Sequence, residues 1–221
     1  MGILLYWWNR PFHRENILSR NPDYFMIPVS KIYTGIQQAG LYGTLKSGLY
    51  SMKYLDSVDA LLFHSKTLVN ISEDTTFNIN NRFEVGIGRR GATHPRITRS
   101  KLSTTPGSSI SHTGTGSANI GPGSIVHIEG DFSMGDSYIN SDSRILCGDE
   151  ITIGDNVAIA WNFEILDDDR HQIVINGERP DKTDPIEICD DVWIGHDVSV
   201  HKGVTIHEGS VVASDSVILS D

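Results

Sequence analysis

The densest group of reactive side chains lies in residues 165–188, ILDDDRHQIVINGERPDKTDPIEI. Here Asp167, Asp168 and Asp169 stand just before an arginine and His171. A histidine side chain exchanges protons near neutral pH, and a neighbouring carboxylate can hold its tautomer or bind substrate hydroxyl groups. In a polar loop a histidine is most often merely solvated. The segment therefore indicates acid–base chemistry without fixing the reaction.

The chain that must position this segment repeats every six residues. From residue 188 onward every sixth residue is a β-branched aliphatic: Ile188, Ile194, Val200, Ile206, Val212 and Ile218. Helices repeat every 3.6 residues and ordinary strands every two, so neither explains a period of six. Three hexapeptides form one triangular coil of about 18 residues, with the aliphatic residues pointing inward. The sequence predicts a mainly β fold, a parallel β-helix of the hexapeptide-repeat type.

Upstream, the same register places Ile128, Met134, Asn140 and Leu146 inward, slips by one residue and resumes at Ile153. Asn140 is the exception among these aliphatic residues. A polar residue at an inward position must find partners or lower stability, so Asn140 is either a functional residue or part of an asparagine ladder or corner turn. Between about residues 88 and 118 the register is irregular, and we place no loops there.

The N-terminal part differs in pattern. Residues 30–58 carry apolar residues three to five apart, which predicts one bent helix or two short ones. Each of four glycines in this stretch costs about 1 kcal/mol relative to alanine, so the helix must depend on packing. We divide the chain into residues 1–65, a partly helical N-terminal segment, and residues 66–221, a β-helix domain with an inserted loop at about 166–185.

Composition and charge narrow the functional classes. The net charge of −10 is the sum of +6 over positions 1–110 and −16 over positions 111–221. The basic half lacks interleaved aromatics, so we expect no nucleic acid partner. Two cysteines make no disulfide framework, and the start is a poor signal peptide, so we expect a cytoplasmic protein. Contact of the N-terminal segment with a membrane stays open.

From residue 126 onward the chain resembles the left-handed β-helix, hexapeptide-repeat acyltransferases, especially the sugar O-acetyltransferases of the galactoside, maltose and surface-polysaccharide type. The matching stretches are CGDEITIGDNVAIAWNFEILDDDRH and PIEICDDVWIGHDVSVHKGVTIHEGSVV. The resemblance implies a left-handed β-helix, a homotrimer with sites between adjacent prisms, acetyl-coenzyme A as acyl donor and a sugar or glycan as acceptor. It implies no metal.

The resemblance also implies roles for single residues. His171 stands where the family has its catalytic base, with Asn140 and Asp169 as further catalytic candidates. Substrate-binding positions are Asp167, Asp168 and Asn162, and positions that flank the pantetheine arm of coenzyme A are Trp193, Gly195, His196, Ala213 and Ser214. One departure is that Ser214-Asp215 replaces the family's usual Ala-Gly pair. The sequence ends at Asp221, so we assign no coenzyme A contacts to a later tail.

Two other functions stay open at this stage. His196 and His201 are five residues apart, a spacing similar to that of the zinc histidines in γ-class carbonic anhydrases, which share this solenoid. His171 would then be the third ligand. Alternatively, the β-helix is a non-catalytic trimeric scaffold whose N-terminal segment recruits partners.

Overall fold

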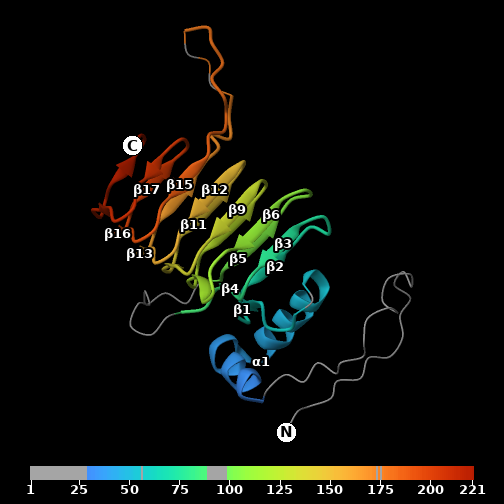
Figure 1. Cartoon of the computed structure of the whole chain (residues 1–221). Helices are drawn as coiled ribbons and strands as arrows, with labels where there is room; N and C mark the ends of the chain where they lie inside the picture. The colour runs from blue at the N-terminus through green and yellow to red at the C-terminus, as the bar shows by residue number, and fades with distance from the viewer. Residues whose placement is uncertain (1–28, 56, 89–98, 173, 175) are drawn as a thin grey trace.

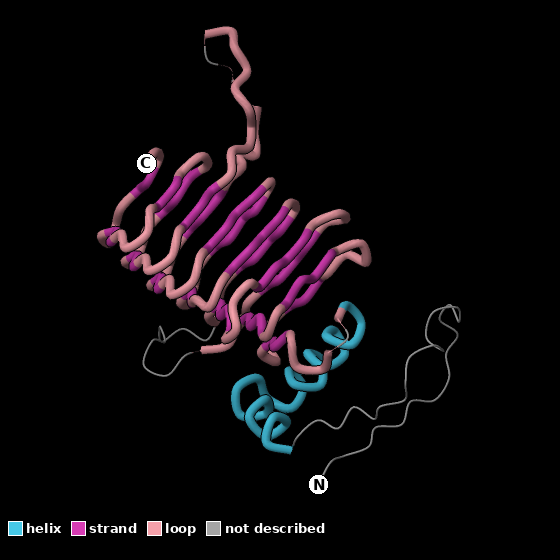
Figure 2. The backbone as a smooth tube through the Cα atoms, viewed as in Figure 1, coloured by secondary structure: helices cyan, strands magenta, loops and turns pink. Residues whose placement is uncertain are grey.

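The predicted fold class is confirmed: the chain forms a left-handed parallel β-helix with a bent helix at its N-terminal end (Figure 1). The structure is a computed structural model that describes residues 29–55, 57–88, 99–172, 174 and 176–221, so much of the predicted N-terminal segment lies outside the described residues. Short strands follow one another around a triangular prism and stack into three long parallel sheets (Figure 2). The prism has three corners, at which the chain turns from one sheet to the next.

The three sheets, called A, B and C here, share no strand. Sheet A contains β1 (Leu61–Phe63), β4 (Arg82–Val85), β7 (Ser117–Ile120), β10 (Tyr138–Ile139), β13 (Ala158–Ile159), β16 (Trp193–Ile194) and β19 (Val211–Val212). Sheet B contains β2 (Leu68–Asn70), β5 (Lys101–Thr104), β8 (Ile125–Ile128), β11 (Arg144–Cys147), β14 (Glu164–Leu166), β17 (Ser199–His201) and β20 (Val217–Ile218). Sheet C contains β3 (Thr76–Ile79), β6 (Ser109–His112), β9 (Asp131–Met134), β12 (Glu150–Ile153), β15 (Ile186–Ile188) and β18 (Thr205–Ile206).

The C-terminal coils follow the predicted period. Ile188 pairs with Ile206, which is three hexapeptides farther along the chain, and Ile194 pairs in the same way with Val212. Ile188 and Ile194 are fully buried inside the prism and Ile206 is 6% exposed, whereas Val212 in the last coil is only partly buried. The prediction of coils made of three hexapeptides is confirmed for this part of the chain.

The register predicted upstream is wrong at Asn140 and Leu146. The buried residues there are Ile139 and Ile145, whereas Asn140 and Leu146 are only partly buried. The slip falls earlier than the repeat suggests, because the step from the inward Met134 to the inward Ile139 is one residue shorter than a hexapeptide. Ile139 then pairs with Ile159, so this middle coil is longer than three hexapeptides.

Helix α1 (Val29–Tyr54) closes the N-terminal end of the β-helix (Figure 1). It bends at Gly40, whose φ of 74° interrupts the helical conformation, as the glycine content suggested. Its buried side is a row of small residues at every fourth position: Gly35, Ala39, Gly43, Ser47 and Ser51. At Gly43 an added Cβ would lie 2.6 Å from the carbonyl oxygen of Phe63, so only glycine permits this close packing on β1.

Two serines of α1 accept hydrogen bonds from backbone N–H groups of β1, the strand at the edge of sheet A. The backbone N–H of Phe63 donates to Ser47 Oγ (2.7 Å), and that of Leu61 donates to Ser51 Oγ (3.0 Å). An unpaired strand edge is prone to pair with other chains, so these bonds protect β1 while they fix the helix. No helix among the described residues is long and apolar enough to cross a membrane.

Candidate functional site

The inserted loop, residues 167–185, leaves the prism at the corner between sheets B and C and projects from it (Figure 1). The chain departs after Leu166 of β14 and returns at Ile186 of β15. This corner is opposite sheet A in the triangular cross-section. The side chains at the base of the loop are held by ionic and hydrogen-bonding contacts.

Asp167 supports the backbone rather than a ligand site. Its side chain is fully buried, and its two carboxylate oxygens accept the N–H groups of Gly148 (2.6 Å) and Asp149 (2.8 Å). Burial raises the pKa of the Asp167 carboxyl, and the backbone donors act against that rise. The predicted role of Asp167 in substrate binding does not fit this geometry, because a buried carboxyl with both oxygens engaged is not available to a sugar.

Asp168 and Asp169 are each paired with a lysine. Asp168 Oδ2 lies 3.0 Å from Lys182 Nζ, and Asp169 Oδ2 lies 2.6 Å from Lys202 Nζ. Burial alone would raise the pKa of Asp168, but the Arg170 backbone N–H and Lys182 outweigh it and lower that pKa. These pairs connect both ends of the loop to each other and to the coil that follows it in the chain.

Arg170 continues this anchoring toward the face of sheet B. Its Nη1 lies 2.7 Å from Glu129 Oε1, and this pairing, above all, lowers the pKa of Glu129. The same carboxylate oxygen lies 2.9 Å from His127 Nε2, and His127 Nδ1 lies 2.9 Å from Ser103 Oγ. Sequence reasoning missed this network, although the spacing of His127 and Glu129, two residues apart beside a strand, was a signal that both lie on one face.

His171 follows directly after these anchored residues and is exposed to solvent. Within the described part of the chain, the contacts of Asp168 and Asp169 are made with Lys182, Lys202, the Arg170 guanidinium and backbone, not with the imidazole. The sequence-based role of Asp169 as the group that orients His171 therefore finds no support in the single chain. What the loop base does provide is a fixed backbone immediately before the histidine.

The two asparagines lie at corners between sheets A and B. Asn140 is partly buried, and its Oδ1 accepts the backbone N–H of Ser141 (2.8 Å), which is the corner turn considered as an alternative from sequence. Asn162 has a φ of 57° and donates through Nδ2 to the Asp197 carboxylate of the next coil. Both side chains thus stabilise turns, and neither is near the inserted loop along the prism perimeter.

The residues predicted to contact coenzyme A do come together, at the turns of residues 195–198 and 213–216, here called the A–B corner. The Gly195 N–H donates to Val212 O (2.9 Å), and the His196 N–H donates to Ser214 Oγ (3.2 Å). A Cβ at Gly195 would meet Ser214 N at 2.6 Å, so the two coils approach as closely as backbone allows. Trp193 lies just before this corner and half of its surface is exposed.

The Ser214-Asp215 departure does not obstruct the A–B corner. Ser214 turns its hydroxyl toward the His196 N–H, and Asp215 occupies the left-handed turn position with a φ of 61°. Ala213 is exposed beside them. Small residues, accessible backbone and one flat aromatic are features that suit a narrow thioester-bearing arm, so the residues present fit that group.

The structure does not favour the zinc hypothesis. His196 stacks on Trp161 with ring centroids 5.0 Å apart, and its Nδ1 lies 2.7 Å from Asp197 Oδ2. Among the described residues, the potential ligand atoms that lie close together belong to His196, Asp197 and Asp215. His201 is in β17 of sheet B and does not join that group.

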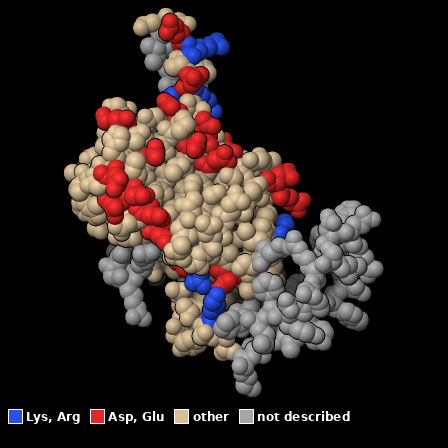
Figure 3. Space-filling model, in the orientation of Figure 1, with Lys and Arg blue, Asp and Glu red and all other residues tan. Residues whose placement is uncertain are grey.

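The surface charge reflects the difference in net charge between positions 1–110 and positions 111–221. Asp and Glu side chains gather over the C-terminal coils and near the inserted loop on the face shown in Figure 3, where Lys and Arg are few. A polyanion would be repelled from this face.

The comparisons with known proteins agree with the predicted resemblance. Residues 185–220 match the bacterial transferase hexapeptide family (six repeats). A hexapeptide-repeat acetyltransferase of Vibrio cholerae O1 biovar eltor, solved in complex with acetyl coenzyme A, is 31% identical over 50% of this chain, with a TM-score of 0.38. The chain spans about three fifths (61%) of the length of this relative.

Two further solved structures are similar to the chain at lower identity. The polysialic-acid-specific acetyltransferase NeuO is 18% identical over 74% of this chain and 75% of its own, with a TM-score of 0.42. The polysialic acid O-acetyltransferase OatWY is 23% identical over 70% and 76%, with a TM-score of 0.41. None of the curated protein sequences matches the chain.

Proposed function

We propose that this protein is a coenzyme A-dependent O-acyltransferase that transfers an acetyl group from acetyl-coenzyme A to a hydroxyl of a sugar or glycan. The observation that carries this proposal is the presentation of His171. It is exposed at the base of a loop whose preceding residues are paired with Lys182, Lys202 and Glu129. A base must be held at a fixed position to act on a substrate hydroxyl, and this anchoring supplies that condition.

The proposed chemistry assigns two proton transfers to His171. A free alcohol is a weak nucleophile near neutral pH, so His171 accepts the hydroxyl proton as the oxygen attacks the acyl carbon. The thioester supplies an activated acyl carbon and a good leaving group. The imidazolium then returns the proton to the departing sulfur, which leaves His171 neutral for the next cycle.

We also propose that the site lies between two copies of a homotrimer. His171 is at the corner between sheets B and C, whereas Trp193 and the A–B corner lie across the prism. In one chain these groups are on different corners, so a site that uses both requires a neighbouring prism. A rotationally symmetric ring places one corner of each copy against a different corner of the next.

Titration calorimetry and turnover test the proposed function together. Purified protein, stripped of metal, should bind acetyl-coenzyme A saturably and acetylate members of a sugar panel. His171→Ala should reduce turnover by about 10²–10⁴-fold without changing the hydrodynamic mass. His207→Ala, at another exposed histidine, is the matched control and should keep full activity. Stoichiometric zinc with no binding of acetyl-coenzyme A would instead point to metal chemistry.

The location and the membrane contact are further parts of this proposal. Cys147 and Cys189 are free thiols, which supports a reducing compartment such as the cytoplasm.

Helix α1 has three lysines, no acidic residue and a row of exposed Leu41, Leu45 and Leu49, which supports contact with an anionic membrane surface. Flotation with phosphatidylglycerol vesicles should recover the protein, and Leu45→Ser/Leu49→Ser should abolish recovery.

A further inference from the structure

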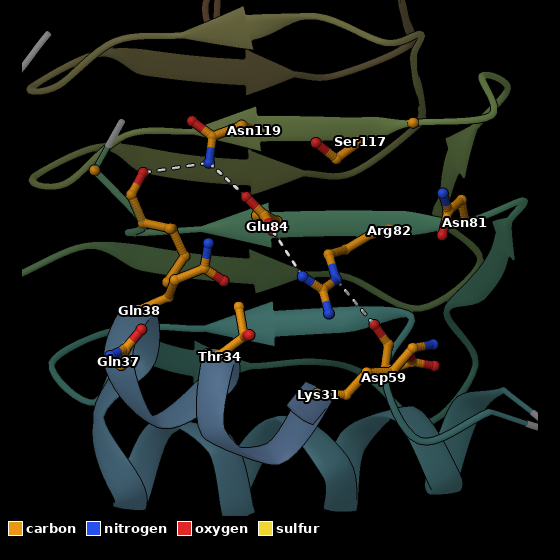
Figure 4. Close-up of a pocket in the computed structure, with 13 residues that line it drawn as sticks. Lys31, Thr34, Gln37, Gln38, Asp59, Asn81, Arg82, Glu84, Ser117 and Asn119 are labelled. Atoms are coloured by element: carbon orange, nitrogen blue, oxygen red, sulfur yellow. Dashed lines mark hydrogen bonds and ion pairs between the residues drawn. The ribbon is translucent and has the colours of Figure 1, made fainter. Parts of the chain in front are cut away.

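A polar cleft lies between α1 and sheet A, away from the inserted loop (Figure 4). Its volume is about 1080 Å³, large enough for more than one sugar unit. Gln37 and Gln38 reach into it from α1, and Arg82 and Glu84 from β4. Ile87 is the one aliphatic side chain among its lining residues. Such a lining is unsuited to an apolar ligand.

The floor of the cleft is a fixed polar network. Glu84 and Asn119 are 7% and 2% exposed, and Asn119 Nδ2 donates to Glu84 Oε2 (2.9 Å) and to Ile87 O (3.2 Å). Arg82 Nη1 lies 3.5 Å from Glu84 Oε1, and its Nε donates to Asp59 O (3.4 Å). A network held in this way keeps its orientation when a ligand arrives.

The charges that line the cleft occur in opposite pairs. Arg82 faces Glu84, and Lys31 Nζ lies 2.5 Å from Asp59 Oδ2. Among the described residues that line the cleft, the charges therefore sum to zero. Its glutamine and asparagine side chains each carry donors beside an acceptor, which matches sugar hydroxyl groups, since these also donate and accept.

A continuous column of residues joins the cleft to Trp193. In sheet A, Glu84 pairs with Asn119, Asn119 with Tyr138, Tyr138 with Ala158, and Ala158 with Trp193. Residues in register on parallel strands point to the same side of a sheet, so all five lie on the outer face. Four strand spacings of about 4.8 Å separate Glu84 from Trp193 by roughly 19 Å.

We propose that this cleft is a remote subsite for the glycan acceptor, and that it binds an uncharged, hydroxyl-rich unit of the same chain whose reacting unit lies beyond Trp193. This inference rests on the proposed function, because it extends that acceptor site along sheet A. It predicts that acceptors of several units are preferred over single sugars. It also predicts that the preference is lost when the cleft is altered.

Variants on the helix side of the cleft test the proposal without disturbing the core. Gln37→Ala/Gln38→Ala removes two exposed amides and places alanine in a helix, so folding should be unaffected. Lys66→Ala, an exposed residue outside the cleft, is the matched control. The probe is an array of uncharged and sialylated oligosaccharides, from single sugars to long oligomers, read with labelled protein in the absence of acetyl-coenzyme A.

The wild type and Lys66→Ala should retain uncharged oligosaccharides of several units, and the double glutamine variant should bind them about tenfold more weakly. In turnover, the variant should raise KM for long acceptors by a similar factor and leave single-sugar kinetics unchanged. Retention of no uncharged glycan, or equal retention by the double variant, overturns the subsite. Retention of sialylated chains only, through the cleft, overturns the assignment of an uncharged ligand. Loss of acetyl-coenzyme A binding or of all turnover bears on the proposed function instead.

Discussion

Two corners of the same prism are built in different ways. At the A–B corner the coils stack with backbone contacts and small residues, as Gly195 does against Ser214. At the corner between sheets B and C the inserted loop is held by ion pairs, among them Arg170 with Glu129. A corner without an insertion is fixed by close packing, whereas a corner that carries a loop needs paired charges to define where the loop begins. The difference suits a site in which one corner seats a narrow arm and the other presents a base.

The largest expected effect concerns whether the two corners meet within one chain or between chains. His171→Ala and Trp193→Ala should each be nearly inactive alone. When the two are co-expressed with different tags and purified as mixed trimers, about one third of wild-type activity should return, because one interface in three then has both wild-type residues. Turnover of doubly tagged protein gives the measurement. Mixed trimers as inactive as the single variants would contradict a shared site.

Removal of Asp167 should weaken the loop corner from below. Asp167→Ala leaves the partly buried N–H groups of Gly148 and Asp149 without their acceptor, which should lower the free energy of unfolding by about 1–3 kcal/mol. Asp167→Asn should cost less, since it keeps one acceptor oxygen and removes a buried charge. Urea unfolding of the three proteins gives the order. Equal stability of the alanine variant and the wild type would be inconsistent with a structural role.

The close packing of the A–B corner can be tested with a pair of glycines. Gly195→Ala introduces a Cβ 2.6 Å from Ser214 N and should lower the free energy of unfolding by about 1–3 kcal/mol. Gly48→Ala, in α1, meets its nearest atom at 3.8 Å and should stabilise the protein by about 0.5–1 kcal/mol. Thermal unfolding of both variants and the wild type measures the two changes in stability. A neutral Gly195→Ala would show that the coils can separate.

The smallest effect should come from the ion pair at the loop base. Because the folded-state pKa of Glu129 is lowered, its pairing with Arg170 stabilises the fold above the unfolded pKa of glutamate, and this contribution is lost as the pH falls through the folded-state pKa. Glu129→Gln should speed hydrogen exchange of residues 167–172 at pH 7 by up to about fivefold, as expected for a partly exposed pair. The variant should also lose the acid dependence of this exchange, which we expect in the wild type as the pH falls below the unfolded glutamate pKa of about 4.3.

The predictability of the fold varied along the chain for a physical reason. From residue 188 onward each coil has the same length, so the inward positions of Ile194 and Val200 follow from counting by six. Farther upstream the spacing of the inward residues varies, and the step from Met134 to Ile139 is one residue shorter than a hexapeptide, which a count by six cannot locate. That is why Asn140 was placed inside the prism when Ile139 occupies that position.

The candidate site shows the same division. The order of reactive residues along the loop was visible from sequence, including the aspartates before His171. Their environments were not. Asp167 continues the register that pairs Leu166 with Leu146, which places its side chain inside the prism. There it accepts hydrogen bonds from the backbone of the preceding coil. Asp168 and Asp169 pair with Lys182 and Lys202, which are distant from them in the chain.

The sequence by itself determined the solenoid, the helix at its start and the segment that bears His171, because each depends on a local period or a local composition. Only the tertiary structure decided which carboxylates are available to a ligand and which are hydrogen-bonded within turns, since that depends on the neighbouring coil. It also decided that His171 lies at the corner between sheets B and C whereas Trp193 lies in sheet A, and that a polar cleft shares a face with Trp193. These relations follow from the stacking of strands that are a full coil or more apart in the chain, and no short-range pattern records them.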